Sequence, residues 1–397
     1  MLDVVAITNA SDWQELAQEW TALIERCPCA TPFQRPEWLL PWWRWFGSGE
    51  MAALAFYAEG RLVGHLPIFI HWWEGCRRVT LIGNGITDNL GLTAEPEYSA
   101  ECARLAFQWL WRHRGRWDLC DWQDLPADSP LLAAQFGGLE ATVAPHLNGT
   151  AAPIGADFER YVKALPHGLC RTIRLAARRL ERAGELRFQT LRADHDASAL
   201  RALFRLHEER WRDKGGPGSM MSSNSTQSFL FDVTQAFSAR GMLRMYIMRF
   251  RGEPAAMIYG ILDGSRLYGY ITGMDPELGR YSPGSLLLHY AIRDAIADGA
   301  RTWDFLRGQE SYKFQWGAQT IFKRRMFIWH SAEFAPAAAA GAGGGMGGFE
   351  NAENFGLAAL VTGNARGIGP GGDAAGEKNP QRAQTARYTS SIHGPVN

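Results

Sequence analysis

The spacing of apolar residues predicts the same series of helices and strands twice along the chain. In the first half, Trp13, Leu16 and Trp20 recur at helical intervals, and the apolar runs that follow are typical of strands. The predicted helices are Asp12–Glu25, Pro36–Phe46, Tyr98–His113 and Pro126–Gly138, and the predicted strands are Ala52–Ala58, Leu62–Trp72, Val79–Ile82, Trp117–Trp122 and Leu139–Ala144.

The second half repeats this order, with two helices, three strands, a long helix and a further strand. Short matches support the repeat: Trp117-Asp118-Leu119 resembles Trp303-Asp304-Phe305, and the turn at Glu59-Gly60-Arg61 resembles the turn at Arg251-Gly252-Glu253. The order predicts two α+β lobes with mixed sheets and three-layer α/β packing in each. The predicted elements are helices at Ala197–Arg212, Thr226–Ala239, Ser285–Ala297 and Ser311–Trp316, and strands at Leu243–Phe250, Ala255–Leu262, Arg266–Thr272, Thr302–Leu306 and Phe322–Trp329.

Four segments follow from these patterns. Residues 1–155 are expected to form an N-terminal lobe, 156–195 a basic helical linker that begins the second lobe, and 196–334 the C-terminal lobe. All 16 tryptophans lie before residue 330. Residues 335–397 are rich in Gly and Ala and have few large apolar side chains, so we expect a disordered tail.

The predicted linker helix, Leu169–Ala183, separates apolar from basic positions. Leu169, Ile173, Ala176 and Leu180 share one stripe, and the remaining surface carries arginines at 171, 174, 178, 179 and 182. Two interpretations stay open: an ordinary solvated face, or a site for an anionic ligand such as a phosphate, an acidic carrier protein or RNA.

Composition limits the possible functions. The 41 basic and 41 acidic residues leave no net charge, whereas a duplex-DNA binder usually has a basic excess. The sequence has no long apolar segment or signal-peptide pattern, so a cytoplasmic protein with reduced cysteines is expected. It has no zinc-ligand spacing, Walker A loop, G-x-S-x-G elbow or strand-linked G-x-G-x-x-G, and no metal is predicted.

The segment from Tyr268 to Trp316 carries the densest candidate chemistry. A strand and a flexible turn lead through Gly279–Ser285 into a helix, whose N-terminus can bind an anion such as a pyrophosphate. Charged and aromatic residues follow at a strand end, and a preceding helix can face the same cleft; these are Asp304, Arg307, Glu310, Tyr312 and Lys313, with His207 and Trp211. An ordinary helix entry and a solvated charged surface remain the alternatives.

Several motifs together resemble a known family. They are Pro32-Phe33-Gln34-Arg35-Pro36-Glu37-Trp38 with Trp42-Trp43, the Arg-rich helix at 171–184, Leu206-His207-Glu208-Glu209-Arg210-Trp211, Tyr281-Ser282-Pro283-Gly284, and Trp303–Gly308 through Tyr312-Lys313. Over residues 5–330 the chain resembles the GNAT-type acyltransferases of the BioF2-like/CelD group, often linked to cellulose or exopolysaccharide biosynthesis. It is also similar to the FemAB aminoacyltransferases, which have two GNAT lobes.

The resemblance implies two tandem GNAT lobes and an acyl-CoA co-substrate, with no metal. Donor phosphates would bind at Arg280, Tyr281, Ser282, Gly284 and Ser285, although Gly284 and Pro283 depart from the family pattern [RQ]-x-x-G-x-[GA]. An amine, for example on a small acceptor or an amino sugar, would attack the thioester. Glu310 or Asp304 would act as base, Tyr312 as acid and Lys313 as oxyanion or substrate anchor, and substrate would contact His207, Trp211 and Arg307.

Two other functions stay open at this point. One is a FemAB-like aminoacyltransferase that uses aminoacyl-tRNA, and the other is a non-catalytic component of exopolysaccharide synthesis. Acyl-CoA binding would separate the enzyme from the scaffold. The sequence alone assigns no acceptor, acyl chain length or oligomeric state.

Overall fold

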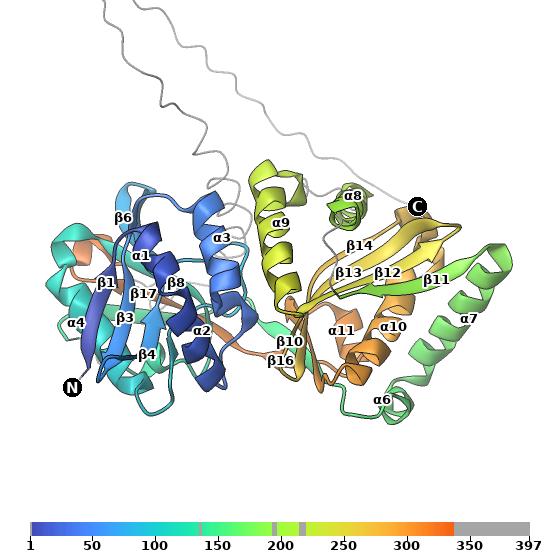
Figure 1. The fold of residues 1–397 in the computed structure, drawn as a ribbon, viewed down its shortest axis with the longest axis horizontal. Helices are drawn as coiled ribbons and strands as arrows, with labels where there is room; N and C mark the ends of the chain where they lie inside the picture. The colour runs from blue at the N-terminus through green and yellow to red at the C-terminus, as the bar shows by residue number, and fades with distance from the viewer. Residues whose placement is uncertain (1, 135–136, 193–196, 214–219, 337–397) are drawn as a thin grey trace, which may run out of the picture.

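The chain folds into two lobes that lie side by side (Figure 1). The computed structural model describes residues 2–134, 137–192, 197–213 and 220–336 of the 397. The tail predicted at 335–397 lies outside the described residues apart from its first two positions. None of the helices in these ranges combines the length and hydropathy of a bilayer-spanning segment.

The first lobe contains helices on both sides of its strands. Its helices are α1 (Ala10–Glu15), α2 (Ala17–Arg26), α3 (Pro36–Phe46), α4 (Ser99–Arg112) and α5 (Pro130–Ala133). Its first strands are β1 (Asp3–Ile7), β2 (Glu50–Met51), β3 (Ala53–Ala58), β4 (Arg61–Leu66), β5 (Ile68–Trp73), β6 (Cys76–Leu81), β7 (Thr93–Ala94), β8 (Leu119–Pro126) and β9 (Glu140–Pro145).

The second part of the chain has the same kinds of element. Its helices are α6 (Phe158–Ala164), α7 (His167–Ala183), α8 (Ala197–Asp213), α9 (Asn224–Ala239), α10 (Pro283–Ala297) and α11 (Ser311–Gln315), and η4 (Pro276–Tyr281) is a 3₁₀ helix. Its strands are β10 (Gly149–Pro153), β11 (Leu186–Leu191), β12 (Leu243–Phe250), β13 (Glu253–Asp263), β14 (Arg266–Met274), β15 (Thr302–Arg307), β16 (Gln319–Ile321) and β17 (Lys323–Trp329).

The sheet of the first lobe divides at a proline. Strand β4 pairs with β3 in a four-stranded sheet, whereas β5, which follows directly after Pro67, pairs with β6 in a six-stranded sheet of order β2-β5-β6-β8-β17-β9. Proline has no N–H to donate to a neighbouring strand. One long predicted strand, Leu62–Trp72, is therefore two strands in two sheets.

The second lobe has one seven-stranded sheet, of order β11-β12-β13-β14-β15-β10-β16. Helices α8 and α9 pack on one face in a core cluster that also includes α1, α2 and α3 of the first lobe. Helices α7 and α10 pack on the other face. The predicted three-layer packing with mixed sheets is confirmed, and one apolar core continues across the boundary between lobes.

The lobes exchange a strand in each direction. Strand β10, which precedes the second-lobe helices, pairs with β15 and β16 of the second sheet. Strand β17, at the other end of the second lobe, pairs with β8 and β9 of the first. The predicted boundaries at residues 155, 196 and 334 remain a prediction, but hydrogen-bonded strand pairing crosses residue 155 through β10 and β17, and residue 196 through β11 and β12.

The repeat is visible in the structure, although one of the two sequence matches begins before its strand in the first lobe and within its strand in the second. Both predicted turns adopt positive φ at their central residues, Glu59 and Gly60 in one lobe and Arg251 and Gly252 in the other. Trp117 and Asp118, however, precede β8, whereas Trp303 and Asp304 lie within β15. The predicted helix Pro126–Gly138 is also wrong in extent, because β8 runs to Pro126 and α5 covers only Pro130–Ala133.

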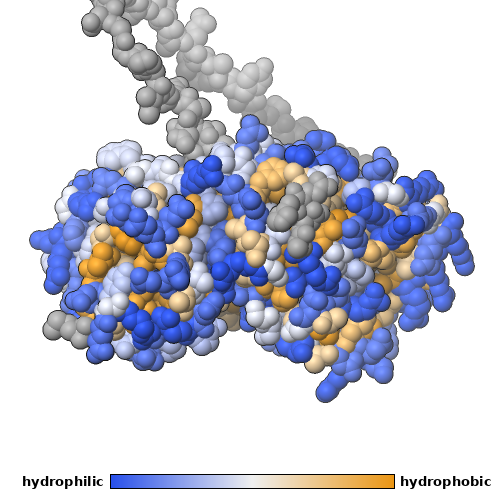
Figure 2. Space-filling view, in the orientation of Figure 1, coloured by the Kyte–Doolittle hydropathy of each residue, from blue (hydrophilic) through white to orange (hydrophobic). Residues whose placement is uncertain are grey.

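Helix α7 is amphipathic, as predicted. Leu169, Ile173, Ala176 and Leu180 are buried against the second sheet and α10. The arginines at 171, 174, 178, 179 and 182 are exposed. Figure 2 shows a largely hydrophilic surface at the end of the molecule where α7 lies.

Candidate functional site

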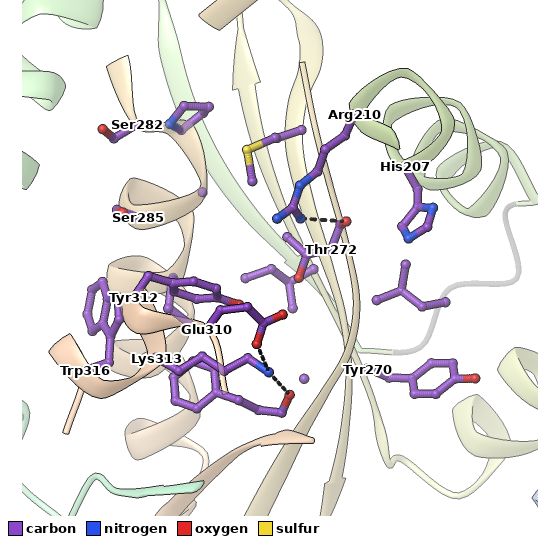
Figure 3. Close-up of a pocket in the computed structure, with 18 of the residues that line it drawn as sticks. His207, Arg210, Tyr270, Thr272, Ser282, Ser285, Glu310, Tyr312, Lys313 and Trp316 are labelled. Atoms are coloured by element: carbon purple, nitrogen blue, oxygen red, sulfur yellow. Dashed lines mark hydrogen bonds and ion pairs between the residues drawn. The ribbon is translucent and has the colours of Figure 1, made fainter. Parts of the chain in front are cut away.

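A pocket opens where β14 and β15 separate. The two strands pair in parallel only from Arg266–Tyr268 to Thr302–Asp304. Beyond that point both strands line a cavity of about 460 Å³, which is bordered by α8, α10 and α11 (Figure 3). The separation leaves part of β14 without a strand partner on that side, so the cavity has a polar wall of backbone groups.

Asp304 fixes the strand at the point of separation. Its carboxylate accepts a hydrogen bond from the Leu306 N–H at 2.9 Å and from Arg266 at 3.0 Å. Leu306 has a φ of 57°, and the pairing of β15 with β10 shifts register here. Burial raises the pKa of Asp304. Asp304 is not part of the pocket lining, and its contacts instead hold the turn at Leu306 and the start of β14 in place.

The start of α10 forms one wall of the pocket. Ser282 has a φ of 49° and precedes Pro283, and the N–H groups of Ser285 and Leu286 both point back to the Ser282 carbonyl, at 3.1 and 3.2 Å. Ser282, Gly284 and Ser285 line the pocket. Because Pro283 has no N–H and Ser285 uses its own, this helix start offers fewer free donors than a typical phosphate loop.

Two of the predicted donor-binding residues do not line the cavity. Arg280 stacks over the ring of Tyr281, with 4.8 Å between the guanidinium carbon and the ring centroid. Both lie in or at the end of η4, outside the pocket lining. Of the predicted donor-binding residues, Ser282, Gly284 and Ser285 line the cavity.

Lys313 and Glu310 form an ion pair in the lining of the pocket. The Nζ of Lys313 donates to the carbonyls of Arg307 at 2.7 Å, Gly308 at 3.2 Å and Phe305 at 3.3 Å, and lies 2.8 Å from the Glu310 carboxylate. Lys313 is buried, whereas 58% of the Glu310 side chain is exposed. Lys313 thus shapes the end of β15 and orients Glu310, and its donors are already in use.

The ionisation states of Glu310 and Tyr312 suit them to opposite roles. Burial would raise the pKa of Glu310, but the hydrogen bond from Lys313, a backbone hydrogen bond and the charges of Lys313 and Arg210 together outweigh it, so the pKa is lowered. Burial, assisted by the Glu310 charge, raises the pKa of Tyr312 to about 12. Near neutral pH the pocket therefore holds an ionised carboxylate beside a protonated phenol, an acceptor and a donor for protons.

Helix α8 contributes the opposite wall. His207, Arg210 and Trp211 line the pocket, and the Trp211 indole donates to His207 Nε2 at 3.1 Å. Burial lowers the pKa of His207 to about 4, so the imidazole is neutral. Arg210 donates to the Thr272 carbonyl at 3.4 Å. The sequence motif 206–211 contained Arg210, but residue type alone did not distinguish it from its charged neighbours.

Arg307 connects the pocket to the first lobe. It lines the cavity and also donates to the Asp124 carboxylate at 3.0 Å and to the Thr87 carbonyl at 3.1 Å, with its Nε 3.5 Å from Asp88. Asp88 and Asp124 belong to the first lobe and were not among the predicted site residues. No sequence signal identified them, because the contact depends on how the lobes pack.

The structure thus brings most of the predicted residues to one cavity. Glu310, Tyr312, Lys313, Ser282, Gly284, Ser285, His207, Trp211 and Arg307 line it, and Asp304, Arg280 and Tyr281 do not. Five residues of β14 line it as well, Gly269, Tyr270, Ile271, Thr272 and Met274. Within the described residues, no group of three or more His, Cys, Asp or Glu side chains is arranged to hold a metal ion.

Comparisons with known proteins agree with this fold. Residues 169–314 match the family model described as an acetyltransferase (GNAT) domain. No curated protein matches the chain by sequence. Among solved structures, FemX is 12% identical with a TM-score of 0.60, covering 83% of this chain and 98% of its own.

Two further structures have the same architecture at low identity. A conserved protein of unknown function from Bacteroides thetaiotaomicron is 11% identical with a TM-score of 0.53, covering 83% of this chain and 100% of its own. L-PGS from Bacillus licheniformis is 11% identical with a TM-score of 0.52, covering 81% and 94%. At this identity the likeness establishes the fold. The chain therefore shares the mixed α/β, GNAT-like fold of these structures over both lobes, and residues 169–314, most of the second lobe, match the acetyltransferase (GNAT) domain model.

Proposed function

We propose that the chain is an N-acyltransferase that binds an acyl thioester between β14 and β15. The observation that carries this proposal is the cavity itself. It is bordered by the N-terminus of α10, where a phosphate is favoured by the helix dipole, and by Glu310 and Tyr312, which differ in ionisation. A donor with an anionic end and a reactive thioester needs both features.

The reaction requires two proton movements. The amine nitrogen attacks the thioester carbonyl carbon, the C–N bond forms and the C–S bond breaks. The amine loses a proton to the Glu310 carboxylate, and the departing thiolate takes a proton from Tyr312. Lys313 holds the carboxylate in place through its 2.8 Å contact.

The finer assignments belong to the same proposal. The donor is acyl-CoA and the acceptor is a small amine or an amino sugar. Polysaccharide, cellulose or cell-envelope synthesis in the cytoplasm is the setting that the sequence motifs imply. The BioF2-like/CelD group is supported by those motifs, whereas the family comparison supports the wider GNAT class.

A thermal-shift screen tests the donor. Purified full chain is heated with acetyl-CoA, longer acyl-CoAs or free coenzyme A; a ligand at 100 times its Kd adds about 2.7 kcal/mol of stability. In Ser285→Glu, we expect the shift to disappear, because the new carboxylate stands where the phosphates bind. A glutamate in the first turn of a helix is favourable, so the variant should fold.

The matched control is Ala100→Glu. It adds the same charge in the first turn of α4, the first-lobe helix that corresponds to α10, at an exposed position. The control should keep the full ligand shift. If no acyl-CoA stabilises the parent protein, coenzyme A is not the donor.

A second candidate function is aminoacyl transfer from tRNA. The observations that favour it are the exposed arginines of α7, none of which forms an ion pair with another described residue, and the small number of free N–H groups at the start of α10. If this is the function, aminoacyl-tRNA binding should weaken steeply with salt. Arg174→Glu combined with Arg178→Glu should abolish it, whereas acyl-CoA binding should be unchanged.

A further inference from the structure

The pocket lining contains more positive than negative side chains. Arg210, Arg307 and Lys313 are cationic and Glu310 is anionic. His207 adds no charge near neutral pH, because burial lowers its pKa to about 4. The three cations differ in whether a protein carboxylate neutralises their charge.

Two of the cations are compensated. Lys313 is paired with Glu310 and bonded to three carbonyls. Arg307 lies against the carboxylates of Asp124 and Asp88, at 3.0 and 3.5 Å. The positive charges of Lys313 and Arg307 are therefore already neutralised by protein carboxylates.

Arg210 differs from both. Its one hydrogen bond among the described residues is the long contact to the Thr272 carbonyl, at 3.4 Å, and it forms no ion pair with them. A guanidinium has five N–H donors in a planar fork, so most of them remain for a ligand. In Figure 3, Arg210 reaches from α8 over β14 into the pocket, on the opposite side from Ser282 and Ser285.

We propose that Arg210 binds a carboxylate of the substrate at the reacting end of the pocket. This inference rests on the proposed function. The donor phosphates belong at α10, across the cavity, whereas Arg210 is close enough to the acid–base pair for its charge to act on both Glu310 and Tyr312. A planar carboxylate matches the guanidinium fork, and the partly exposed rings of Trp211 and Tyr312 offer apolar walls.

The carboxylate has two possible sources. It is either the far end of a dicarboxylic acyl group or the α-carboxylate of an amino-acid acceptor. Both place a negative charge near the carbonyl that reacts. The chemistry at Arg210 is the same, and the experiment distinguishes the sources.

The first arm uses no coenzyme A. Saturation-transfer NMR measures binding of butyrate and of its neutral analogue butyramide to the full chain. We expect butyrate to bind at least tenfold more tightly, equivalent to about 1.4 kcal/mol. The preference should vanish in Arg210→Gln and return in part in Arg210→Lys, with folding of each variant checked by circular dichroism.

The matched control is Arg205→Gln. Arg205 lies on the same helix, is exposed, and pairs with Glu209 at 3.1 Å away from the pocket lining. This variant should keep the full preference for butyrate. Equal binding of butyrate and butyramide to the parent, or an unchanged preference in Arg210→Gln, overturns the proposal.

The second arm identifies the source by calorimetry. Tighter binding of succinyl-CoA than of butyryl-CoA, lost in Arg210→Gln, assigns the carboxylate to the donor. Tighter binding of L-alanine than of ethylamine, lost in the same variant, assigns it to the acceptor. If succinyl-CoA binds no more tightly than butyryl-CoA, and L-alanine no more tightly than ethylamine, butyrate binding is adventitious and the proposed carboxylate site is refuted. If no acyl-CoA binds but the alanine preference holds, the donor proposal fails while the carboxylate site stands.

Discussion

The two lobes contain the same junction between parallel strands, but they use it differently. In the second lobe, β14 and β15 pair over three residues and then separate around an open pocket. In the first, β6 and β8 pair over Arg78–Thr80 and Leu119–Asp121. There the loop after β6 and the end of β8 are bridged by Arg307 of the second lobe, through Asp88 and Asp124.

The two junctions of this repeated fold therefore have different structural roles. One junction opens into the pocket, and at the other the carboxylates of Asp88 and Asp124 hold Arg307, which lines that pocket. The contacts of Arg307 with Asp88 and Asp124 place charged groups in a buried environment, which disfavours their charged forms. Burial raises the pKa of Asp88, and burial lowers the pKa of Lys323, which interacts with Asp88, Asp124 and Asp304. The first lobe therefore supports the pocket by fixing Arg307.

Removing Arg307 should have the largest effect on the molecule. Arg307→Ala leaves Asp88 and Asp124 buried with less compensating charge, and breaking one side of such a pair costs about 3 kcal/mol. Urea denaturation should show this loss in the free energy of unfolding. Arg104→Ala, which breaks the exposed pair with Glu101 on α4, is the control and should cost less than about 0.5 kcal/mol.

A small loss in Arg307→Ala, below about 1 kcal/mol, would contradict the bridging role. Asp124→Asn then provides a second measurement from the first-lobe side. It keeps the shape of the side chain but removes the charge that Arg307 faces, and it should alter ligand binding in a pocket that Asp124 does not line.

Glu310→Gln should have the next largest effect, on the rate. The amide cannot accept the amine proton, and general-base catalysis contributes at least about a hundredfold. kcat should fall by that factor with the donor that gives the largest thermal shift, while KM for the donor changes little. A rate within threefold of the parent would remove Glu310 from the proposed chemistry.

Gly273→Ala tests how tightly α8 must lie against β14. A Cβ at Gly273 would stand 2.8 Å from Leu206 Cβ and 2.9 Å from the His207 backbone nitrogen. We expect a loss of about 2 kcal/mol in stability and weaker ligand binding, because α8 also carries Arg210 and Trp211. Gly115→Ala, where a Cβ would meet nothing within 4 Å at a position outside the pocket lining, should behave like the parent, and equal behaviour of both variants would contradict the prediction.

The sequence predicted what depends on local patterns. Helix α3 was predicted at its observed limits, Pro36–Phe46, because proline fits a first helical turn and the apolar spacing is regular. The strand exchange was not predicted: β10 is a short run of small residues, and nothing local specifies which sheet it joins.

The site shows the same limit. The crowding of Glu310, Tyr312 and Lys313 after a strand was visible in the sequence, since these residues are close along the chain. The use of Lys313 as a clamp for three carbonyls depends on the path of the backbone at Gly308, which has a φ of 101°. The contacts of Arg307 with Asp88 and Asp124 depend on how the lobes pack, so they could not be predicted from the spacing of residues along the chain.

Tyr312→Phe should have the smallest effect, a loss of rate at the open junction that does not change with pH. Burial raises the pKa of Tyr312 to about 12, so the phenol stays protonated from pH 6 to 10 and can donate to the thiolate throughout. The variant should be about tenfold slower, since solvent replaces a positioned acid, and kcat/KM should fall by the same factor at every pH in this range. If the parent instead loses activity near pH 10 and the variant does not, Tyr312 titrates as an exposed phenol, and the pocket is more hydrated than its burial indicates.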